Sequence, residues 1–258
     1  MIQRTFPRQS GFTLVEIAIV LVIIGLILGG VLKGQELVTN ARVRNIADQQ
    51  NAYKAAFFAF QDRYQAVPGD YLQASSNIPG LAGITTANGD GDGFIGYDTG
   101  TGKTAANATT EGNERILAFT HLSAAGFISC AACVSAGATG GAPSQANSPV
   151  NAFGGVISIG YDNDFGYASA SPLPNPNNNL KSGDKIPSNI LAEVDAKVDD
   201  GNPYTGVFQF SLNSASTGGG TQPNPANCIA LTPSGTAPTN SIWNRQTPAS
   251  DCGAAFTF

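Results

Sequence analysis

The stretch that decides the fold reads GFTLVEIAIVLVIIGLILGGVL and occupies residues 11–32. From Phe12 to Leu32 it has 21 residues, and Glu16 is its only charged side chain. At about 1.5 Å per residue, a helix of this length crosses the hydrocarbon core of a bilayer. We therefore expect residues 12–32 to form a membrane-spanning helix.

The short segment before this stretch predicts its orientation. Residues 1–10 are polar and carry two basic side chains, Arg4 and Arg8. Basic residues that flank a membrane helix tend to stay in the cytoplasm, so the chain beyond the helix is expected to be exported. An ordinary secretory signal would have a shorter apolar core and a small-residue cleavage site after it, whereas here the helical pattern continues.

Glu16 distinguishes the segment from an ordinary membrane anchor. A lone carboxylate within the bilayer costs about 3 kcal/mol, so an acid at this place is expected to have a partner. A plain membrane anchor would have no need of such an acid.

The step from Gly11 to Glu16, followed by the apolar run, resembles the cleavage motif of type IV prepilins and type II secretion pseudopilins. The resemblance implies that a prepilin peptidase cuts after Gly11 and that Phe12 becomes an N-methylated N-terminus. It also implies that Glu16 pairs with the N-terminal amine of a neighbouring subunit, so that Glu16 is an assembly residue and not a catalytic one. Residues 1–11 would then be a leader peptide. Its removal leaves 11 basic against 18 acidic residues and changes the net charge from -5 to -7.

The same resemblance implies a structural subunit, major or minor, of a type IV pilus-like filament that assembles through its N-terminal helix. Two alternatives stay open: a pseudopilin of a type II secretion system, and a minor or tip pilin whose head binds DNA or a surface ligand. The implied partners are prepilin peptidase, other pilin or pseudopilin subunits, the inner-membrane assembly platform, and membrane lipid before assembly. The expected location is the bacterial inner membrane with the head in the periplasm, and then a pilus or pseudopilus filament.

The helical pattern continues beyond the membrane segment. Apolar residues recur at helical spacing among polar ones, so residues 33–66 are expected to extend the helix outside the membrane. Pro68 and Gly69 then form a turn. Residues 67–258 are rich in Gly, Asn, Ser, Thr and Pro, which suits short strands and long loops in a globular head. The expected fold class is α+β, with a long N-terminal helix packed on a small antiparallel sheet.

Four regular elements are expected in the head: helices at residues 114–125 and 188–198, and strands at residues 156–159 and 207–212. Gly126 is expected to stop the first of these helices, and Ser188 or Asn189 to cap the second. The Pro/Asn-rich stretch 172–179 is expected to form a loop, and residues 213–258 are expected to be loop-rich.

The segment NGDGDGFI, residues 88–95, matches the first half of a calcium loop. It has oxygen-bearing side chains at alternate positions, Gly at the sixth position and an apolar residue at the eighth. The twelfth position is Thr99 instead of Glu, so the shell would need another acid, such as Glu111 or Glu114. The candidate Ca²⁺ ligands are Asn88, Asp90, Asp92 and Asp98. The alternative is an ordinary turn without an ion.

Four cysteines allow three disulfide pairings, and an exported chain favours disulfides over free thiols. We expect Cys130–Cys133 and Cys228–Cys252, and the second pair resembles the disulfide-bounded region of type IV pilins. For the CxxC pair, a redox motif and half of a zinc site completed by His121 and the other cysteines are the alternatives.

Nothing in the sequence predicts an enzyme. His121 is the only histidine, and no activated Ser motif or paired-acid site accompanies it. A lone His on a helix is most often a packed or capping residue. A net charge of -5 without a Lys/Arg cluster also argues against nucleic acid as a specific partner.

Overall fold

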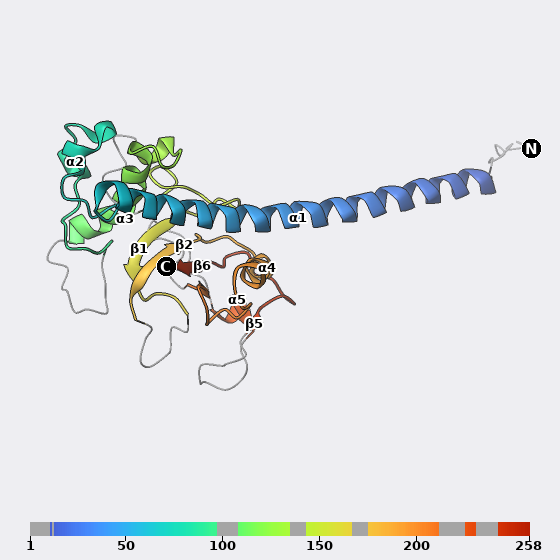
Figure 1. Cartoon of the computed structure of the whole chain (residues 1–258). Coiled ribbons are helices and arrows are strands. Elements are labelled where there is room, and N and C mark those ends of the chain that lie inside the picture. The colour runs from blue at the N-terminus through green and yellow to red at the C-terminus, as the bar shows by residue number, and fades with distance from the viewer. Residues whose placement is uncertain are drawn as a thin grey trace, which may run out of the picture. The chain divides into compact units, whose positions relative to one another are not determined.

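The computed structural model of the chain (Figure 1) describes residues 11, 13–96, 108–134, 143–166, 175–211, 225–230 and 242–258. The chain divides into two compact units, residues 1–41 and residues 42–258. In chain order, the elements are α1 (Leu14–Tyr64), α2 (Ala74–Asn77), η1 (Pro79–Leu81), η2 (Thr85–Ala87), α3 (Ala108–Ala124), η3 (Ala131–Val134), β1 (Ser158–Asp162), β2 (Asn177–Lys181), α4 (Ser188–Val198), β3 (Phe208–Phe210), α5 (Pro225–Cys228), β4 (Ile229–Ala230), β5 (Ile242–Trp243) and β6 (Ala254–Thr257).

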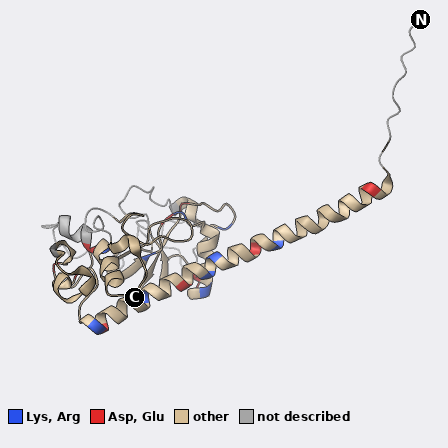
Figure 2. Cartoon of the chain, turned by 90° about the horizontal axis from the view of Figure 1, so that it is seen from above, with Lys and Arg blue, Asp and Glu red and all other residues tan. Residues whose placement is uncertain are grey.

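The described secondary structure of the first unit is the beginning of α1. Every residue from Leu14 to Leu32 is exposed. Figure 2 shows a long uncharged stretch of α1 after its first turn. By length and composition this part of the helix is apolar enough to cross a membrane, as the sequence predicted. No proline interrupts the stretch.

In the second unit, α1 buries one face. Seven of its buried and half-buried positions are separated by three and four residues in alternation, which places them in a single stripe. They are Val43, Ile46, Gln50, Tyr53, Phe57, Phe60 and Tyr64. The helix ends after Tyr64 because Gln65 adopts a left-handed conformation, with φ at 50°, and Pro68 follows shortly.

The main sheet of the second unit has four antiparallel strands in the order β1-β2-β6-β3. The strand near the C-terminus, β6, therefore lies between β2 and β3, and Figure 1 shows β1, β2 and β6 side by side. A separate two-stranded sheet joins β4 and β5. The long helix followed by a small antiparallel sheet confirms the α+β prediction.

Four strands occur where the sequence predicted a loop or a loop-rich region. β2 begins inside the Pro/Asn-rich stretch 172–179, and β4, β5 and β6 lie in the stretch 213–258. The predicted strands at 156–159 and 207–212 correspond to β1 and β3, although β1 starts two residues later than expected. The loop prediction failed for β2 because asparagine has low strand propensity, and here hydrogen bonds compensate for it. Asn179 Nδ2 donates to Asp162 Oδ1 over 2.9 Å across the β1–β2 pair.

A buried ionic cluster lies on one face of β1 and β2. Lys181 has 0% of its side chain exposed, and its Nζ lies 2.9 Å from Asp162 Oδ2 and 3.7 Å from Asp164 Oδ2. Arg115, from α3, donates to the same Asp162 Oδ2 over 2.8 Å. Burial alone would raise the pKa of Asp162, but the adjacent Lys181 and Arg115 lower it to about 2. Arg115 reaches the sheet over Gly160, where an added Cβ would lie 3.0 Å from the guanidinium.

The two predicted head helices are present with different ends. α3 begins at Ala108, earlier than the predicted 114, and Gly126 ends it as predicted, with φ at 81°. The backbone N–H of Phe127 donates to Leu122 O and that of Gly126 donates to Ser123 O, which is a Schellman motif. α4 spans the predicted residues, but its N-cap is Pro187 and no side chain caps it. The Ser188 hydroxyl instead donates to Asn244 O over 2.6 Å, so the capping prediction was wrong.

Candidate functional site

Helix α1 starts with reciprocal hydrogen bonds between Thr13 and Glu16. The Thr13 backbone N–H donates to Glu16 Oε2 over 2.8 Å, and the Glu16 backbone N–H donates to Thr13 Oγ1 over 3.3 Å. The Thr13 hydroxyl also donates to Glu16 Oε2 over 2.9 Å. These contacts form a capping box, in which the N-cap residue and the third helical residue satisfy each other's polar groups. Glu16 therefore has a polar partner within its own chain.

The predicted cleavage position lies just before this cap. Gly11 is exposed, and a Cβ added to it would meet no atom within 4 Å. Thr13 is exposed as well. Phe12, the predicted methylation site, lies outside the described residues, as do Arg4 and Arg8. On its described side, the predicted cleavage position is thus open to an approaching enzyme.

A second group of functional candidates lies in the head, where α1 gives way to the loop. Asp70 follows the turn at Pro68 and is 5% exposed. Its Oδ1 accepts the backbone N–H of Gly91 over 2.6 Å and of Asp92 over 3.0 Å, and its Oδ2 accepts that of Gly93 over 2.8 Å. Burial raises the pKa of Asp70 to about 6, although these three N–H groups act in the opposite direction.

Glu114 approaches the same loop from α3 and is 1% exposed. Its Oε1 accepts the backbone N–H of Asp90 over 3.1 Å and its Oε2 accepts that of Gly96 over 3.0 Å. Burial raises the pKa of Glu114 to about 8, and the charges of Asp90 and Asp70 raise it further.

Asp70, Asp90 and Glu114 form what we call the acidic cluster. Each offers a carboxylate oxygen, and these oxygens all lie within 4.8 Å of one another. No Lys or Arg among the described residues forms an ion pair with any of the three. Within the described part of the chain, the hydrogen bonds to Asp70 and Glu114 come from backbone amides, and oxygen donors so arranged suit a hard cation.

The predicted calcium ligands are only partly brought together. Asp90 belongs to the acidic cluster, whereas Asn88 Oδ1 accepts the backbone N–H of Ser75 over 2.8 Å. Asp92 Oδ1 accepts the backbone N–H of Phe94 over 2.9 Å. Asp98 and the side chain of Glu111 lie outside the described residues. Sequence reasoning missed Asp70 because it precedes the calcium-like segment, and its only signal was the Pro-Gly-Asp turn.

His121 ties this region together from inside. Its Nδ1 accepts the backbone N–H of Gly69 over 2.9 Å, and its Nε2 lies 2.6 Å from Ala87 O. The ring stacks on Phe60 with centroids 6.0 Å apart. Burial lowers the pKa of His121 to about 4, so the ring is neutral at pH 7, with Nε2 as the donor. His121 is a packed residue, as the sequence predicted.

Three more acids gather at the C-terminal end of α4. Asp195 is 0% exposed; its Oδ2 accepts the Trp243 Nε1–H over 2.6 Å and its Oδ1 accepts the Gly201 N–H over 3.1 Å. Asp199 Oδ2 accepts the backbone N–H groups of Val207 and Phe208. Burial raises the pKa of Asp195 to about 6. With Asp200 these residues have oxygens close enough to hold a cation, but the carboxylates of Asp195 and Asp199 already accept the hydrogen bonds from Trp243 and from the backbone of the following turn.

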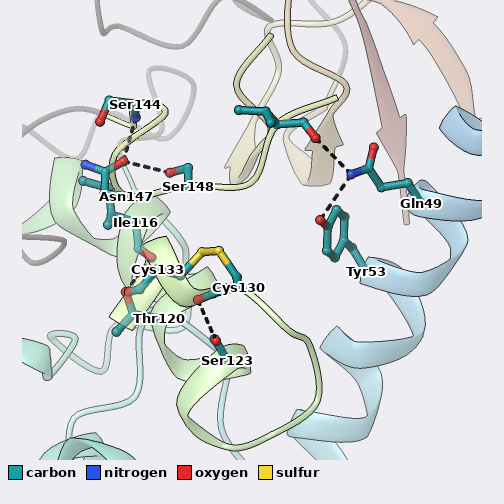
Figure 3. Close-up of a disulfide and its surroundings, with 11 residues drawn as sticks. Gln49, Tyr53, Ile116, Thr120, Ser123, Cys130, Cys133, Ser144, Asn147 and Ser148 are labelled. Atoms are coloured by element: carbon teal, nitrogen blue, oxygen red, sulfur yellow. Dashed lines mark hydrogen bonds between the residues drawn. A yellow bond between two sulfur atoms is a disulfide. The ribbon is translucent and has the colours of Figure 1, made fainter. Parts of the chain in front are cut away.

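The cysteines form the two disulfides expected from the sequence, Cys130–Cys133 and Cys228–Cys252. Figure 3 shows the first at the end of α3, with Thr120 and Ser123 beside it. The structure describes no free cysteine. His121 lies with its two ring nitrogens on backbone groups, so it does not join the cysteines in a zinc site.

Comparison with known proteins identifies the N-terminal segment. No curated protein and no solved structure matches the chain. Residues 6–32 match the family model described as the prokaryotic N-terminal methylation motif. This segment includes Gly11, Phe12 and the capping pair of Thr13 and Glu16. The chain thus carries the prepilin-type signature of type IV pilins and pseudopilins, which supports a pilin-like or pseudopilin subunit.

Proposed function

We propose that the protein is a structural subunit of a type IV pilus-like filament, cut after Gly11 by prepilin peptidase and assembled through α1. The single observation that carries the proposal is the methylation motif at residues 6–32, which continues into a helix whose apolar residues from Leu14 to Leu32 are all exposed. Such a surface needs a nonpolar environment. Lipid supplies it before assembly, and the helices of neighbouring subunits supply it afterwards.

Glu16 supports the assembly step of this proposal. In the single chain its carboxylate accepts from Thr13, whose N–H and hydroxyl are neutral groups. Cleavage after Gly11 would create a charged amine on Phe12, one residue before the cap. The carboxylate already makes charge-assisted hydrogen bonds to Thr13, but a charged amine would add the attraction between opposite charges, which is strong in a medium of low dielectric constant. Exchange of the internal partner for the amine of a neighbouring subunit would therefore favour the filament over the separate subunit.

The processing step is tested by substitution at Gly11. Gly11→Val should block cleavage, because the bulkier side chain occupies the position that an open glycine leaves free. Intact-mass measurement of the membrane-extracted protein should then show Met1 retained, while the parent chain begins at methylated Phe12. Normal cutting of the variant would contradict the motif assignment. Glu16→Ala is the matched control, since it should leave cutting intact and reduce only the yield of filaments.

The location of the head is part of the same proposal. We place residues 42–258 in the periplasm before assembly, supported by Arg4 and Arg8 ahead of the apolar segment and by two disulfides. A pseudopilin of a type II secretion system would share all of these features. Deletion of the gene distinguishes a pilus subunit from a pseudopilin. Loss of surface filaments would favour the pilus, and loss of exoprotein release would favour the secretion system. A tip role predicts instead that filaments persist and that only ligand capture is lost.

For the head we propose that the acidic cluster holds one Ca²⁺ ion. Asp70, Asp90 and Glu114 would supply carboxylate oxygens, and the cation would neutralise charge that the described residues leave without a basic partner. The full chain in detergent should unfold at a higher temperature with 1 mM CaCl₂ (about tenfold above a weak-site Kd) than with EGTA. Asp90→Asn should abolish the difference, and an unchanged response in that variant would contradict the site.

A further inference from the structure

The two disulfides of the head differ in burial and in the length of chain that each closes. Cys228 and Cys252 are both 0% exposed and lie 24 positions apart in the sequence. Cys133 is also 0% exposed, but Cys130 is only half-buried, and these two are three positions apart. The residues beside this pair, Ala131 and Val134, are exposed. Of the four cysteines, Cys130 alone is therefore partly exposed to solvent.

The turn that carries the short disulfide has other supports. The Thr120 hydroxyl donates to Cys133 O over 2.7 Å, and the Ser123 hydroxyl donates to Cys130 O over 3.0 Å, as Figure 3 shows. The Cys133 N–H donates to Cys130 O over 3.1 Å. A disulfide between near neighbours removes little entropy from the unfolded chain. The turn is thus expected to persist when the Cys130–Cys133 bond is open.

The second disulfide has a different role. Cys252 pairs with Ile186 through two backbone hydrogen bonds, and Cys228 O accepts the backbone N–H of Asn244 over 2.9 Å. The bond therefore connects the segment before β6 with the β4–β5 region through the core. A thiol reaches these sulfurs only after that part of the head opens, because both residues are fully buried.

We propose that Cys130–Cys133 is a thiol–disulfide exchange site, with Cys130 as the sulfur that an external thiol attacks. The partner is a dithiol, either a small molecule or an oxidoreductase. Its thiolate attacks Cys130 Sγ, the bond to Cys133 breaks, and Cys133 Sγ takes the electron pair and a proton. The second thiol of the partner then attacks the mixed disulfide and releases Cys130. The head gains two electrons and two protons, and the partner becomes a disulfide. The proposal concerns the head alone and does not depend on filament assembly.

A graded reduction of the full chain tests the proposal without any substitution. The chain in detergent is treated with a series of dithiothreitol concentrations, and the thiols that are released are blocked with N-ethylmaleimide. The disulfides that remain are then fully reduced, and their cysteines are labelled with iodoacetamide. Trypsin places Cys130 and Cys133 on one peptide, between Arg115 and Lys181, and separates Cys228 from Cys252 at Arg245. We expect half-reduction of the short disulfide at a dithiothreitol concentration at least about tenfold lower than that of the long one. Coincident or reversed reduction overturns the proposal.

Single-cysteine variants test which sulfur exchanges. Cys133→Ser leaves Cys130 free, and Cys130→Ser leaves Cys133 free as the matched control. With oxidised glutathione as the probe, the Cys130 thiol should form the mixed disulfide at least about tenfold faster than the Cys133 thiol. Equal rates, or a faster Cys133, overturn the assignment. If a variant loses its unfolding transition, the graded reduction of the parent chain decides by itself.

Discussion

Lys181 depends on Asp162, because a buried ammonium group has no water to solvate it. The nearest carboxylate oxygen is 2.9 Å away, and the other acid, Asp164, lies 3.7 Å away with 35% of its side chain exposed. Folding removes the charges of both Lys181 and Asp162 from water, and each charge offsets the desolvation cost of the other. The pair is therefore better viewed as a constraint on which residues can be changed than as a net source of stability.

Asp162→Asn should cost about 3–5 kcal/mol, since it leaves Lys181 buried without its main counter-charge. Asp164→Asn makes the same chemical change at a more exposed site and should cost about 1 kcal/mol or less. Chemical denaturation of the full chain in detergent, followed through Trp243, measures both. Equal losses in the two variants would mean that Asp162 is not the specific partner of Lys181.

The acidic cluster predicts an unusual dependence of stability on pH. The folded pKa of Glu114 is raised above its unfolded value, so the fold favours the protonated form. Its stabilising contribution is present below pH 4.5 and is lost as the pH rises towards 8. Asp70 adds a loss up to about pH 6. His121 acts oppositely, but only between about pH 4 and 6.5. Among the acids and His121 with a stated folded pKa, only Glu114 titrates between pH 6.5 and about 8, and the charges that face it are Asp90 and Asp70.

With EGTA present, the melting temperature of the head should fall between pH 6.5 and 8. Glu114→Gln should flatten this fall because its amide does not titrate. The absolute stability of the variant is not the test, since glutamine accepts only through its Oε1, whereas the carboxylate receives the N–H groups of Asp90 and Gly96. A slope unchanged by the substitution would show that another group is responsible.

At the scale of single elements, α1 illustrates how one helix has two different sides. Phe57 is 1% exposed and its neighbour Phe58 is 47% exposed, although both rings contact Phe258, at centroid distances of 5.0 and 5.7 Å. Phe57→Ala should destabilise the head by about 3–5 kcal/mol, because it leaves a cavity against the core. Phe58→Ala should cost less than about 1 kcal/mol. Thermal unfolding of the two variants gives the comparison, and similar losses would contradict the stripe of buried residues on α1.

The elements also show which structure the sequence could predict. α1 was predictable because its apolar run and its helical spacing are local patterns, and α4 and the end of α3 carry equally local signals. β2 and β6 were not predictable, because their pairing is set by partners far away in the chain. Lys181 pairs with Ser158 on one side and with Ala255 on the other. In the acidic cluster, Asp90 stood out in the sequence, whereas Asp70 acquires its role only when the turn folds back on the loop.

At the scale of the whole molecule, the two units differ in the surroundings that they need. Buried residues among those described all lie at position 43 or beyond, so the core is complete within residues 42–258. The described residues from Leu14 to Leu32 are all exposed and apolar apart from Glu16. The apolar surface that needs a membrane therefore lies in the first unit. We expect the head, residues 42–258, to fold without that unit.

A fragment of residues 42–258, exported to an oxidising compartment so that both disulfides form, should be soluble without detergent. It should melt within about 4 °C of the head in the full chain, which corresponds to about 1 kcal/mol for a domain of this size. A fragment of residues 65–258 lacks the stripe that contains Phe57 and Phe60, exposes the core beneath it and should aggregate. Circular dichroism and size-exclusion chromatography separate these outcomes. If residues 42–258 also aggregate, the first unit contributes to the fold of the head, and the division of the molecule at position 42 is wrong.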